Sequence, residues 1–292
     1  MGCADLPSTA RRLNSRTRVT PNAVEGSKNT GQFFMRHGSS PQGDTNSKGR
    51  LPSFAGGAAI TIPAFEEGLV RVAHRFGTRL PGAPNEFPEA ASGVHIVAVK
   101  QVHGTEALVL NRNMTKSEVQ EAASSKGFDA IITDRPQTWV TVRTADCVPI
   151  LLMEADRGVV ASVHAGWRGT VGGISRKVIR MMQEIFGCKP GLLRAAIGPS
   201  IGPCCYEVDE PVMQPLKRAF PYWSEALEET MPGRGQLDLR RLNRLALEDA
   251  GVDPCRIAAV NVCTACHPDL FYSYRRDGKG TRHMTSGIAL LE

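Results

Sequence analysis

Residues 129–165 read DAIITDRPQTWVTVRTADCVPILLMEADRGVVASVHA and decide the fold. Four runs in this stretch are rich in Val and Ile and are bounded by Asp, Pro or Gly, which is typical of β-strands. The expected strands are 129–133, 139–143, 148–153 and 159–163. Short turns join them directly, without intervening helices. Direct strand-to-strand connections favour an α+β fold over alternating strands and helices.

Further elements lie on both sides of this stretch. We expect strands at 59–62, 69–72, 94–99, 107–110, 192–197, 257–262 and 287–291, a loop at 73–82, and helices at 116–124, 171–186, 209–220 and 238–250. The helix at 171–186 is the clearest, because its apolar residues recur every three or four positions and Gly187 follows as a stop signal. We therefore predict an α+β, single-domain sandwich of mixed β-sheet flanked by helices, spanning residues 58–292.

Residues 1–57 have a different composition. They are rich in Ser, Gly, Asn, Pro and Arg with few apolar residues, which predicts a disordered or otherwise non-conforming tail. The first 58 residues hold eight Lys and Arg and three acidic residues, so nearly all of the net charge of +6 lies there. The remaining body is almost neutral, and we expect no binding to nucleic acid.

The chain has no apolar run long enough for a membrane span and no secretory signal, so we expect no membrane association. Its eight cysteines, without an export signal, indicate a reducing compartment and a cytoplasmic location. In that compartment cysteines act as thiols or metal ligands.

Three short motifs stand at the edges of expected strands. They are QVHG at 101–104, TADC at 144–147 and HAGWRG at 164–169. Together they offer the imidazoles of His103 and His164 and the thiolate of Cys147. This set suits zinc or copper, and three protein ligands leave a fourth position open, as in catalytic zinc sites. Taken singly, each residue is more often structural, so the prediction requires that the three converge.

Asp146 stands beside the expected ligand Cys147. Adjacent residues on a strand point to opposite faces, so Asp146 is a candidate for a group that orients a ligand, or for a structural cap.

Two other motifs suggest substrate binding. GWRGTVGG at 166–173 leads into a helix, where free backbone N–H groups and Arg168 could hold a phosphate. The alternative is a helix start with glycines for close packing. FYSYRRDG at 271–278 offers aromatic rings that can stack on a base and arginines that can bind phosphate or ribose oxygens. The alternative is an aromatic core closed by an Arg–Asp pair.

Two segments carry paired cysteines. GPSIGPCCYEV at 198–208 is a rigid loop with the adjacent thiols Cys204 and Cys205, which serves either a site or only a turn. Cys263-Thr-Ala-Cys266-His267 matches the c-type haem attachment pattern, which we reject because no export signal is present. A redox dithiol and a plain strand exit with buried thiols are the two remaining interpretations.

Together QVHG, TADC, HAGWRGT, IGPSIGPCCYEV and FYSYRRDG resemble the bacterial laccase-domain family over about residues 59–291. Its members are described as multicopper polyphenol oxidases and as peptidoglycan editing factors. They resemble purine nucleoside phosphorylases that also deaminate adenosine. The resemblance matches Arg79 in AHRFGTR to the family's HGFSTR arginine. Leu80-Pro81-Gly82 departs from the two glycines that follow it there, and the segment between Arg79 and Gln101 is shorter.

The resemblance implies a zinc-dependent purine nucleoside phosphorylase acting on adenosine, inosine, guanosine and methylthioadenosine, with adenosine deaminase activity. Its partners would be small nucleosides and phosphate, and the chain would be a monomer or small homo-oligomer. Zinc would be held by His103, Cys147 and His164, and would activate water for attack on adenine C6. Arginines would hold phosphate in line with ribose C1′. The implied catalytic residues are Arg79 and Asp146, and the implied substrate-binding residues are Gln101, Arg168, Gly169, Thr170, Tyr206, Tyr272 and Arg275.

Three other functions compete with this one. A copper-dependent polyphenol oxidase could use a Cys, two His and a Met, but seven histidines are few for an additional histidine-rich trinuclear centre. A Cys–His amidase in peptidoglycan precursor editing would use Cys147 as nucleophile and therefore needs a thiolate that no metal ligates. A zinc-stabilised scaffold would have no turnover.

Overall fold

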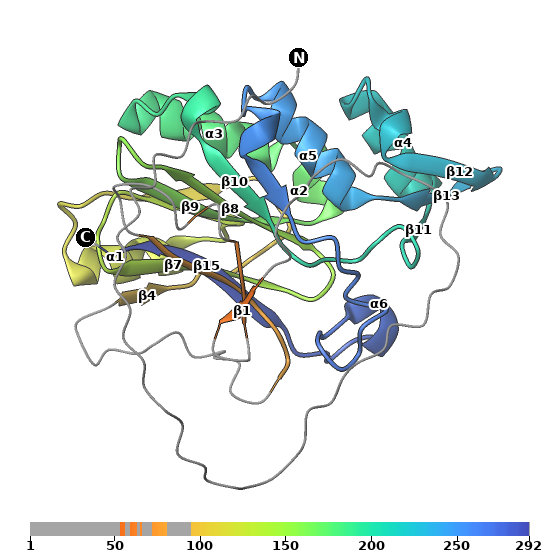
Figure 1. Cartoon of the computed structure of the whole chain (residues 1–292), viewed down its shortest axis with the longest axis horizontal. Helices are drawn as coiled ribbons and strands as arrows, with labels where there is room; N and C mark the ends of the chain where they lie inside the picture. The colour runs from red at the N-terminus through yellow and green to blue at the C-terminus, as the bar shows by residue number, and fades with distance from the viewer. Residues whose placement is uncertain (1–52, 56–58, 63–64, 66–71, 81–94, 292) are drawn as a thin grey trace, which may run out of the picture. The chain divides into compact units, whose positions relative to one another are not determined.

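The four strands of the stretch 129–165 lie in two stacked β-sheets, one of them in the first sheet and three as inner strands of the second (Figure 1). The computed structural model describes residues 53–55, 59–62, 65, 72–80 and 95–291. The first sheet has the spatial order β1 (Ser53–Ala55), β2 (Ala59–Thr61), β3 (Val72–Gly77), β15 (Met284–Leu290), β7 (Thr138–Thr144), β4 (His95–Val97). The second has the order β14 (Ile257–Ala259), β10 (Arg194–Ile197), β8 (Val148–Glu154), β9 (Val159–Ala165), β6 (Ala130–Thr133), β5 (Ala107–Leu110).

The described residues also form α-helices and a small third sheet. The third sheet has the order β11 (Glu207–Asp209), β13 (Arg234–Leu237), β12 (Leu227–Met231). The helices are α1 (Lys116–Ser125), α2 (Trp167–Val171), α3 (Ile174–Phe186), α4 (Glu210–Ala219), α5 (Leu239–Asp249) and α6 (Tyr274–Asp277). In Figure 1, α3 and α5 lie over the second sheet on the side away from β7 and β15.

β8 shows why the quoted stretch reads as continuous apolar runs. Its residues Ile150 and Leu152 belong to the core under the helices, whereas Leu151 and Met153 belong to the core between the two sheets. Since successive side chains of a strand point to opposite faces, both faces of the second sheet are buried. The arrangement is helices, sheet and sheet in three layers. The predicted α+β sandwich with mixed sheets is confirmed.

The predicted helix at 171–186 is wrong at its start. Two helices, α2 and α3, occupy this region, and they are separated by Gly172 and Gly173. The Gly172 N–H donates to the Arg168 carbonyl and the Gly173 N–H donates to the Thr170 carbonyl, each at 2.9 Å, which ends α2, and Gly173 has φ 78°. A glycine adopts this left-handed conformation without the steric penalty that other residues meet, so the chain can change direction here. α3 ends at Gly187, as expected.

The predicted loop at 73–82 is also wrong over most of its described part. β3 pairs antiparallel with β15 and β2, so the charged run AHRFG lies within the sheet. A Cβ on Gly77 would lie 2.5 Å from the Thr285 carbonyl oxygen, so this position requires glycine. The predicted strand at 69–72 lies outside the described residues except for Val72. The strands β11, β12 and β13 were not predicted, because their sequences are polar.

The predicted tail, residues 1–57, lies outside the described residues except for β1. β1 pairs antiparallel with β2, so a strand is already present at Ser53–Ala55, ahead of residue 58. In the part of the chain that the structure describes, no helix is both long and apolar enough to span a bilayer.

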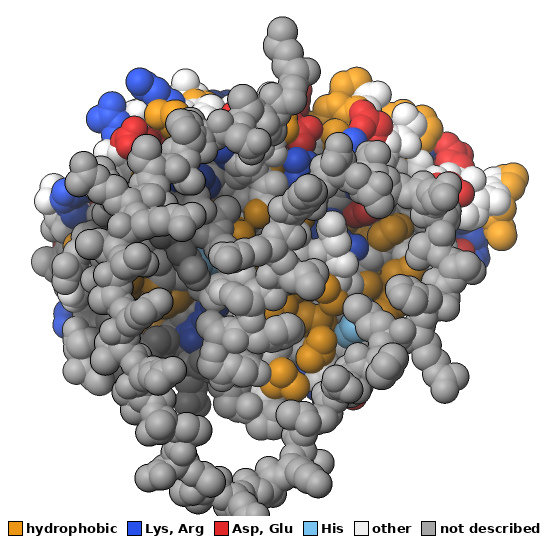
Figure 2. Space-filling view, in the orientation of Figure 1, with side chains coloured by type: hydrophobic (Ala, Val, Ile, Leu, Met, Phe, Trp, Pro, Cys, Tyr) orange, Lys and Arg blue, Asp and Glu red, His pale blue; other side chains and the backbone are white. Residues whose placement is uncertain are grey.

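Charges on the visible face are mixed. Figure 2 shows Lys and Arg side chains beside Asp and Glu side chains over the helices at the top of the view. Several are paired across elements, with nitrogen–oxygen distances of 2.7 Å between Arg176 and Asp249 and 2.6 Å between Arg241 and Glu225. This pairing agrees with the nearly neutral body inferred from the sequence.

His74 in β3 predicts a pH-dependent stability. Burial lowers its pKa from 6.5 to about 4, and its Nε2 accepts a 2.7 Å hydrogen bond from the Ile62 N–H, which needs neutral imidazole. The unfolded chain therefore binds the proton first as the pH falls from 6.5 towards 4. The free energy of unfolding should fall across this window by up to about 3 kcal/mol from this group alone. His74→Gln, whose amide oxygen can accept the same bond, should show a smaller fall in denaturant titrations. Equal pH dependence of the two proteins would contradict this prediction.

Candidate metal centre

The three predicted metal ligands converge. The candidate ligand atoms of His103, Cys147 and His164 all lie within 4.8 Å of one another. Cys147 directly precedes β8, and His164 is near the end of the antiparallel neighbour β9, opposite Pro149. The two imidazole rings stand edge to face, with centroids 4.8 Å apart and an interplanar angle of 81°. Pairing of β8 with β9 thus brings two of the ligands together.

Asp129 fixes the positions of two ligands. Its buried carboxylate lies at the start of β6, with Oδ1 2.7 Å from His164 Nδ1. Oδ1 also accepts a 2.9 Å hydrogen bond from the His103 N–H, and Oδ2 accepts bonds from the N–H groups of Gly104 and Val102 at 2.7 and 3.3 Å. A carboxylate bonded to one ring nitrogen of a histidine orients the other nitrogen towards a metal. His164 Nε2 is therefore the atom left for coordination.

The electrostatics favour a thiolate beside the histidines. Burial alone would raise the pKa of Cys147, but hydrogen bonds with His103 and His164 outweigh burial and lower this pKa to about 7. Burial alone would lower the pKa of His164, but hydrogen bonds with Asp129 and Cys147 raise it to about 9. Hydrogen bonds from the histidine ring nitrogens thus stabilise the Cys147 thiolate. A divalent cation can replace the protons of these bonds, since metal binding to such ligands releases them.

Gly166 borders the three ligands closely. A Cβ at this position would lie 3.1 Å from Cys147 Sγ and 3.1 Å from His103 Cδ2. Any side chain there would therefore crowd the ligand atoms. Two imidazoles, one thiolate and this close backbone fit a borderline metal such as zinc or copper.

Asp146 connects the centre to the C-terminal segment. Its backbone has φ 91°, and its carboxylate accepts hydrogen bonds from Thr264 Oγ1 at 2.6 Å, Ser273 Oγ at 3.0 Å and the Arg275 N–H at 2.7 Å. The Ile201 N–H donates to its carbonyl oxygen at 3.0 Å. These bonds position Cys147 relative to the chain before α6. The predicted catalytic role of Asp146 stays a prediction.

The three ligands border a cavity of about 740 Å³, a size suited to a small molecule. Its lining includes the cationic side chains of Lys100, Arg143, Arg168 and Arg275 and the aromatic side chains of Trp167, Tyr206 and Tyr274. The Arg168 guanidinium lies 4.3 Å from the centre of the Trp167 ring, and that of Arg275 lies 5.2 Å from the Tyr206 ring. The cavity therefore offers cations for an anion and rings for a flat heterocycle.

Four of the predicted substrate-binding residues line this cavity: Gln101, Arg168, Tyr206 and Arg275. The Gln101 side chain pairs with the Arg143 backbone, donating to its carbonyl at 2.8 Å and accepting from its N–H at 2.7 Å. The Arg275 guanidinium donates to the carbonyls of Cys205 and Glu207 at 3.0 and 3.1 Å. Both residues thus also hold the cavity wall together.

Gly169, Thr170, Tyr272 and Arg79 are not among the described residues that line the cavity. Thr170 Oγ1 accepts a hydrogen bond from Asn243 Nδ2 at 3.0 Å, and a Cβ on Gly169 would lie 2.9 Å from the Gly104 carbonyl oxygen. Gly169 and Thr170 are thus closely packed, as the alternative interpretation expects, whereas Arg168 of the same segment lines the cavity, and phosphate binding by the segment stays a prediction. Arg79 donates to the Pro268 carbonyl at 2.7 Å, and its guanidinium lies 5.0 Å from the Tyr272 ring centre.

Sequence reasoning missed several cavity residues, among them Lys100, Arg143, Trp167, Tyr274 and His283. It also missed Asp129. The available signal for Asp129 was an acidic residue between Phe128 and the apolar run at 130–132, where a buried charge needs partners. Burial and the nearby cation Arg143 lower the pKa of His283.

The fold and the site define an α+β protein with three potential metal ligands at the border of a cationic cavity. The chain belongs to the family described as multi-copper polyphenol oxidoreductase laccase, whose model matches residues 87–291.

Similar proteins carry two kinds of names. Over 198 residues the chain is 38% identical to purine nucleoside phosphorylase YlmD of Geobacillus stearothermophilus, covering 67% of this chain and 72% of that protein. It is 35% identical to adenosine deaminase RL5 of an unknown prokaryotic organism, covering 66% of this chain and 74% of that protein. The crystal structure of the Geobacillus YlmD matches with a TM-score of 0.71 and 30% identity, over 83% of this chain and 99% of that one.

Asp129→Asn should weaken zinc binding by about ten- to a hundredfold, because the amide cannot provide the negative charge that orients and polarises His164. The measurement is competition with a chromophoric chelator. Asp134→Asn is the matched control, since Asp134 is bonded to Arg112 at 2.7 Å and does not line the cavity. Equal zinc affinity of Asp129→Asn and the control would contradict the prediction.

Proposed function

We propose that the chain is a zinc-dependent purine nucleoside phosphorylase that also deaminates adenosine. The observation that carries the proposal is the convergence of His103, Cys147 and His164 beside a cavity with cationic and aromatic walls. The names of the similar proteins support the two reactions. The proposed substrates are adenosine, inosine, guanosine and methylthioadenosine, together with phosphate.

The metal would be held by the two imidazoles and the thiolate. A bound zinc ion supplies Lewis-acid chemistry and lowers the pKa of a coordinated water. Asp129 keeps His164 and the 101–104 turn in place for it, through bonds of 2.7 to 3.3 Å.

In phosphorolysis, a bond forms between a phosphate oxygen and ribose C1′ while the bond from C1′ to the purine nitrogen breaks. We assign phosphate binding and the balance of its charge to the arginines that line the cavity, Arg143, Arg168 and Arg275. Trp167, Tyr206 and Tyr274 provide surfaces for the purine. The departing base must also gain a proton. Arg79 and Asp146 remain proposed catalytic residues, with Asp146 the one that borders the cavity.

A Cys–His amidase is the second candidate, because His103 and His164 lower the pKa of Cys147 to about 7. A copper polyphenol oxidase has less support. Among the residues that the structure describes, the two groups of potential metal ligands contain only two histidines, His103 and His164. A histidine-rich trinuclear centre has no counterpart in that part of the chain.

The decisive test uses metal-quantified full-length protein incubated with adenosine, with and without phosphate. Chromatography should resolve phosphate-dependent adenine and ribose 1-phosphate, and also inosine and hypoxanthine. His103→Ala and Cys147→Ala should each lose at least about a hundredfold of this activity, since the metal supplies several kcal/mol of transition-state stabilisation.

His95→Ala is the matched control and should retain the activity, because His95 lies in β4 and does not line the cavity. Folded, zinc-loaded protein that produces neither free base nor inosine would refute the proposal. Hydrolysis of a peptide amide by metal-free protein, lost on alkylation of Cys147, would favour the amidase.

A further inference from the structure

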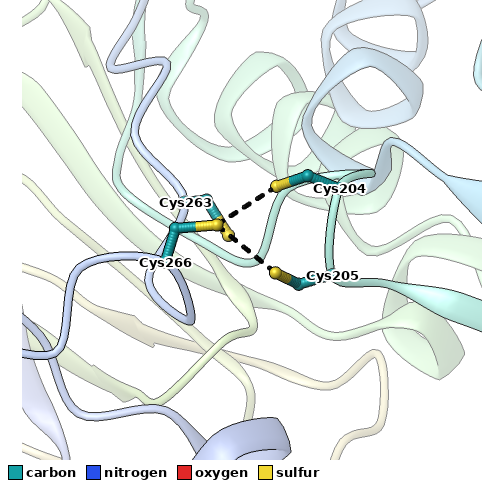
Figure 3. Close-up of side chains that lie close together, drawn as sticks. All are labelled: Cys204, Cys205, Cys263 and Cys266. Carbon is teal, nitrogen blue, oxygen red and sulfur yellow. Dashed lines mark hydrogen bonds between the residues drawn. The ribbon is translucent and has the colours of Figure 1, made fainter. Parts of the chain in front are cut away.

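A second group of potential ligands lies outside the cavity lining. Cys204, Cys205, Cys263 and Cys266 bring their four sulfur atoms within 4.8 Å of one another (Figure 3). Cys266 Sγ lies 3.5 Å from Cys204 Sγ and 3.3 Å from Cys205 Sγ, and all four cysteines are free thiols. We call this group the four-cysteine cluster.

Two separate loops bring the cluster together. Cys204 and Cys205 follow β10, in a turn where the Cys205 N–H donates to the Gly202 carbonyl at 3.0 Å. Cys263 and Cys266 follow β14, the parallel neighbour of β10. A bridge between Ser200 and Cys263 continues that pairing into the loops, and the Thr264 N–H donates to the Ser200 carbonyl at 3.0 Å. The backbone thus fixes the convergence of the four side chains.

We infer that the four-cysteine cluster is a structural metal site that binds one zinc ion through four thiolates. Tetrahedral zinc with bonds of about 2.3 Å places its sulfur ligands about 3.8 Å apart, which is close to the separations in the cluster. Two cysteines separated by two residues, as in Cys263-x-x-Cys266, are a common half of such sites. An iron–sulfur cluster with two irons would also need inorganic sulfide, and its cysteine sulfurs would be spread around two metal atoms. The compact group of four sulfurs therefore fits a single zinc ion better.

The surroundings of the cluster suit a thiolate-bound metal. The Gly202 N–H donates to Cys263 Sγ at 3.2 Å, a bond that stabilises a thiolate ligand. A Cβ on Gly202 would lie 3.3 Å from Cys204 Sγ and 3.2 Å from Cys263 Cβ, so a side chain there would crowd the ligands. The backbone at Gly202 therefore lies close to two of the four cysteines, Cys204 and Cys263.

Charge compensation is also present. A zinc ion with four thiolates carries a net charge of −2, so nearby cations lower the free-energy cost of holding that charge inside the protein. The Arg276 guanidinium donates to the carbonyls of Thr264 and Ala265, the two residues between Cys263 and Cys266, at 3.1 and 3.2 Å. Arg240 Nη2 would lie 3.1 Å from a Cβ on Gly202. Both arginines thus stand beside the loops of the cluster, and Arg276 shares its charge with Asp277, whose Oδ1 lies 2.7 Å from Arg276 Nε.

The site would connect two walls of the cavity. The loop of Cys204 and Cys205 leads directly to Tyr206, and the Arg275 guanidinium donates to the Cys205 carbonyl. A metal that joins this loop to the segment before α6 would therefore restrain two cavity residues without contacting a substrate. This role is structural, and the inference does not rest on the proposed function.

Zinc content of purified full-length protein, saturated with Zn²⁺ and desalted, tests the inference. Cys266→Ser and Cys205→Ser should each contain one zinc per chain less than the unmodified protein, whatever the occupancy of the His103 centre. Cys188→Ala is the matched control, because it removes a buried thiol outside the cluster, and it should retain the full zinc content. Unchanged zinc content in both serine variants would overturn the inference.

Cobalt spectroscopy keeps the test valid if a serine variant does not fold. His103→Ala protein, stripped of zinc and loaded with Co²⁺, should show strong thiolate-to-cobalt charge-transfer bands and the visible bands of tetrahedral cobalt. The absence of these bands from folded protein would overturn the inference, as would a Cys204–Cys266 or Cys205–Cys266 disulfide in zinc-replete protein examined by mass spectrometry. Neither readout depends on nucleoside turnover.

Discussion

The buried carboxylate of Asp129 is the constraint on which the metal centre depends. Its side chain has no exposed surface, and an ionised group without water must satisfy its charge through hydrogen bonds. Three backbone N–H groups of the 102–104 turn and the His164 imidazole do so. The same bonds hold His103 and His164 near each other. The hydrogen bonds that compensate the Asp129 charge therefore also fix the geometry of the two ligands.

Asp146 plays a comparable part on the other side of Cys147. Asp129 connects the centre to the sheets, whereas Asp146 connects it to the segment between β14 and α6 through Thr264, Ser273 and Arg275. Residues from the middle and the end of the chain thus share one cavity. Asp129 accepts from three backbone N–H groups, whereas Asp146 accepts from one backbone N–H group and two hydroxyls, so both carboxylates join separate segments of the chain.

The sequence predicted the centre of the fold well, because strands buried on both faces read as uninterrupted apolar runs. It also indicated the three ligands, since each stands in a short motif at a strand end. The break between α2 and α3 was missed because Val171 and Ile174 preserve the apolar spacing across it. The local sequence marks Asp129 as an acid beside an apolar run but does not identify its partners, and it does not show that the four cysteines converge. The partners lie 25 to 35 and 61 to 62 residues away in sequence, and only the pairing of strands brings them together.

The placement of the His–Cys–His ligands at strand ends has a consequence for the order of events as the protein is made. Long stretches of chain separate His103 from Cys147 and Cys147 from His164, so the nascent polypeptide has no preformed chelating unit, and closing those loops is entropically costly. A metal at this centre would therefore enter after β8 and β9 have paired. Ligands of this kind bind copper more strongly than zinc. The ion taken up would then depend on which metal is supplied to a nearly folded molecule.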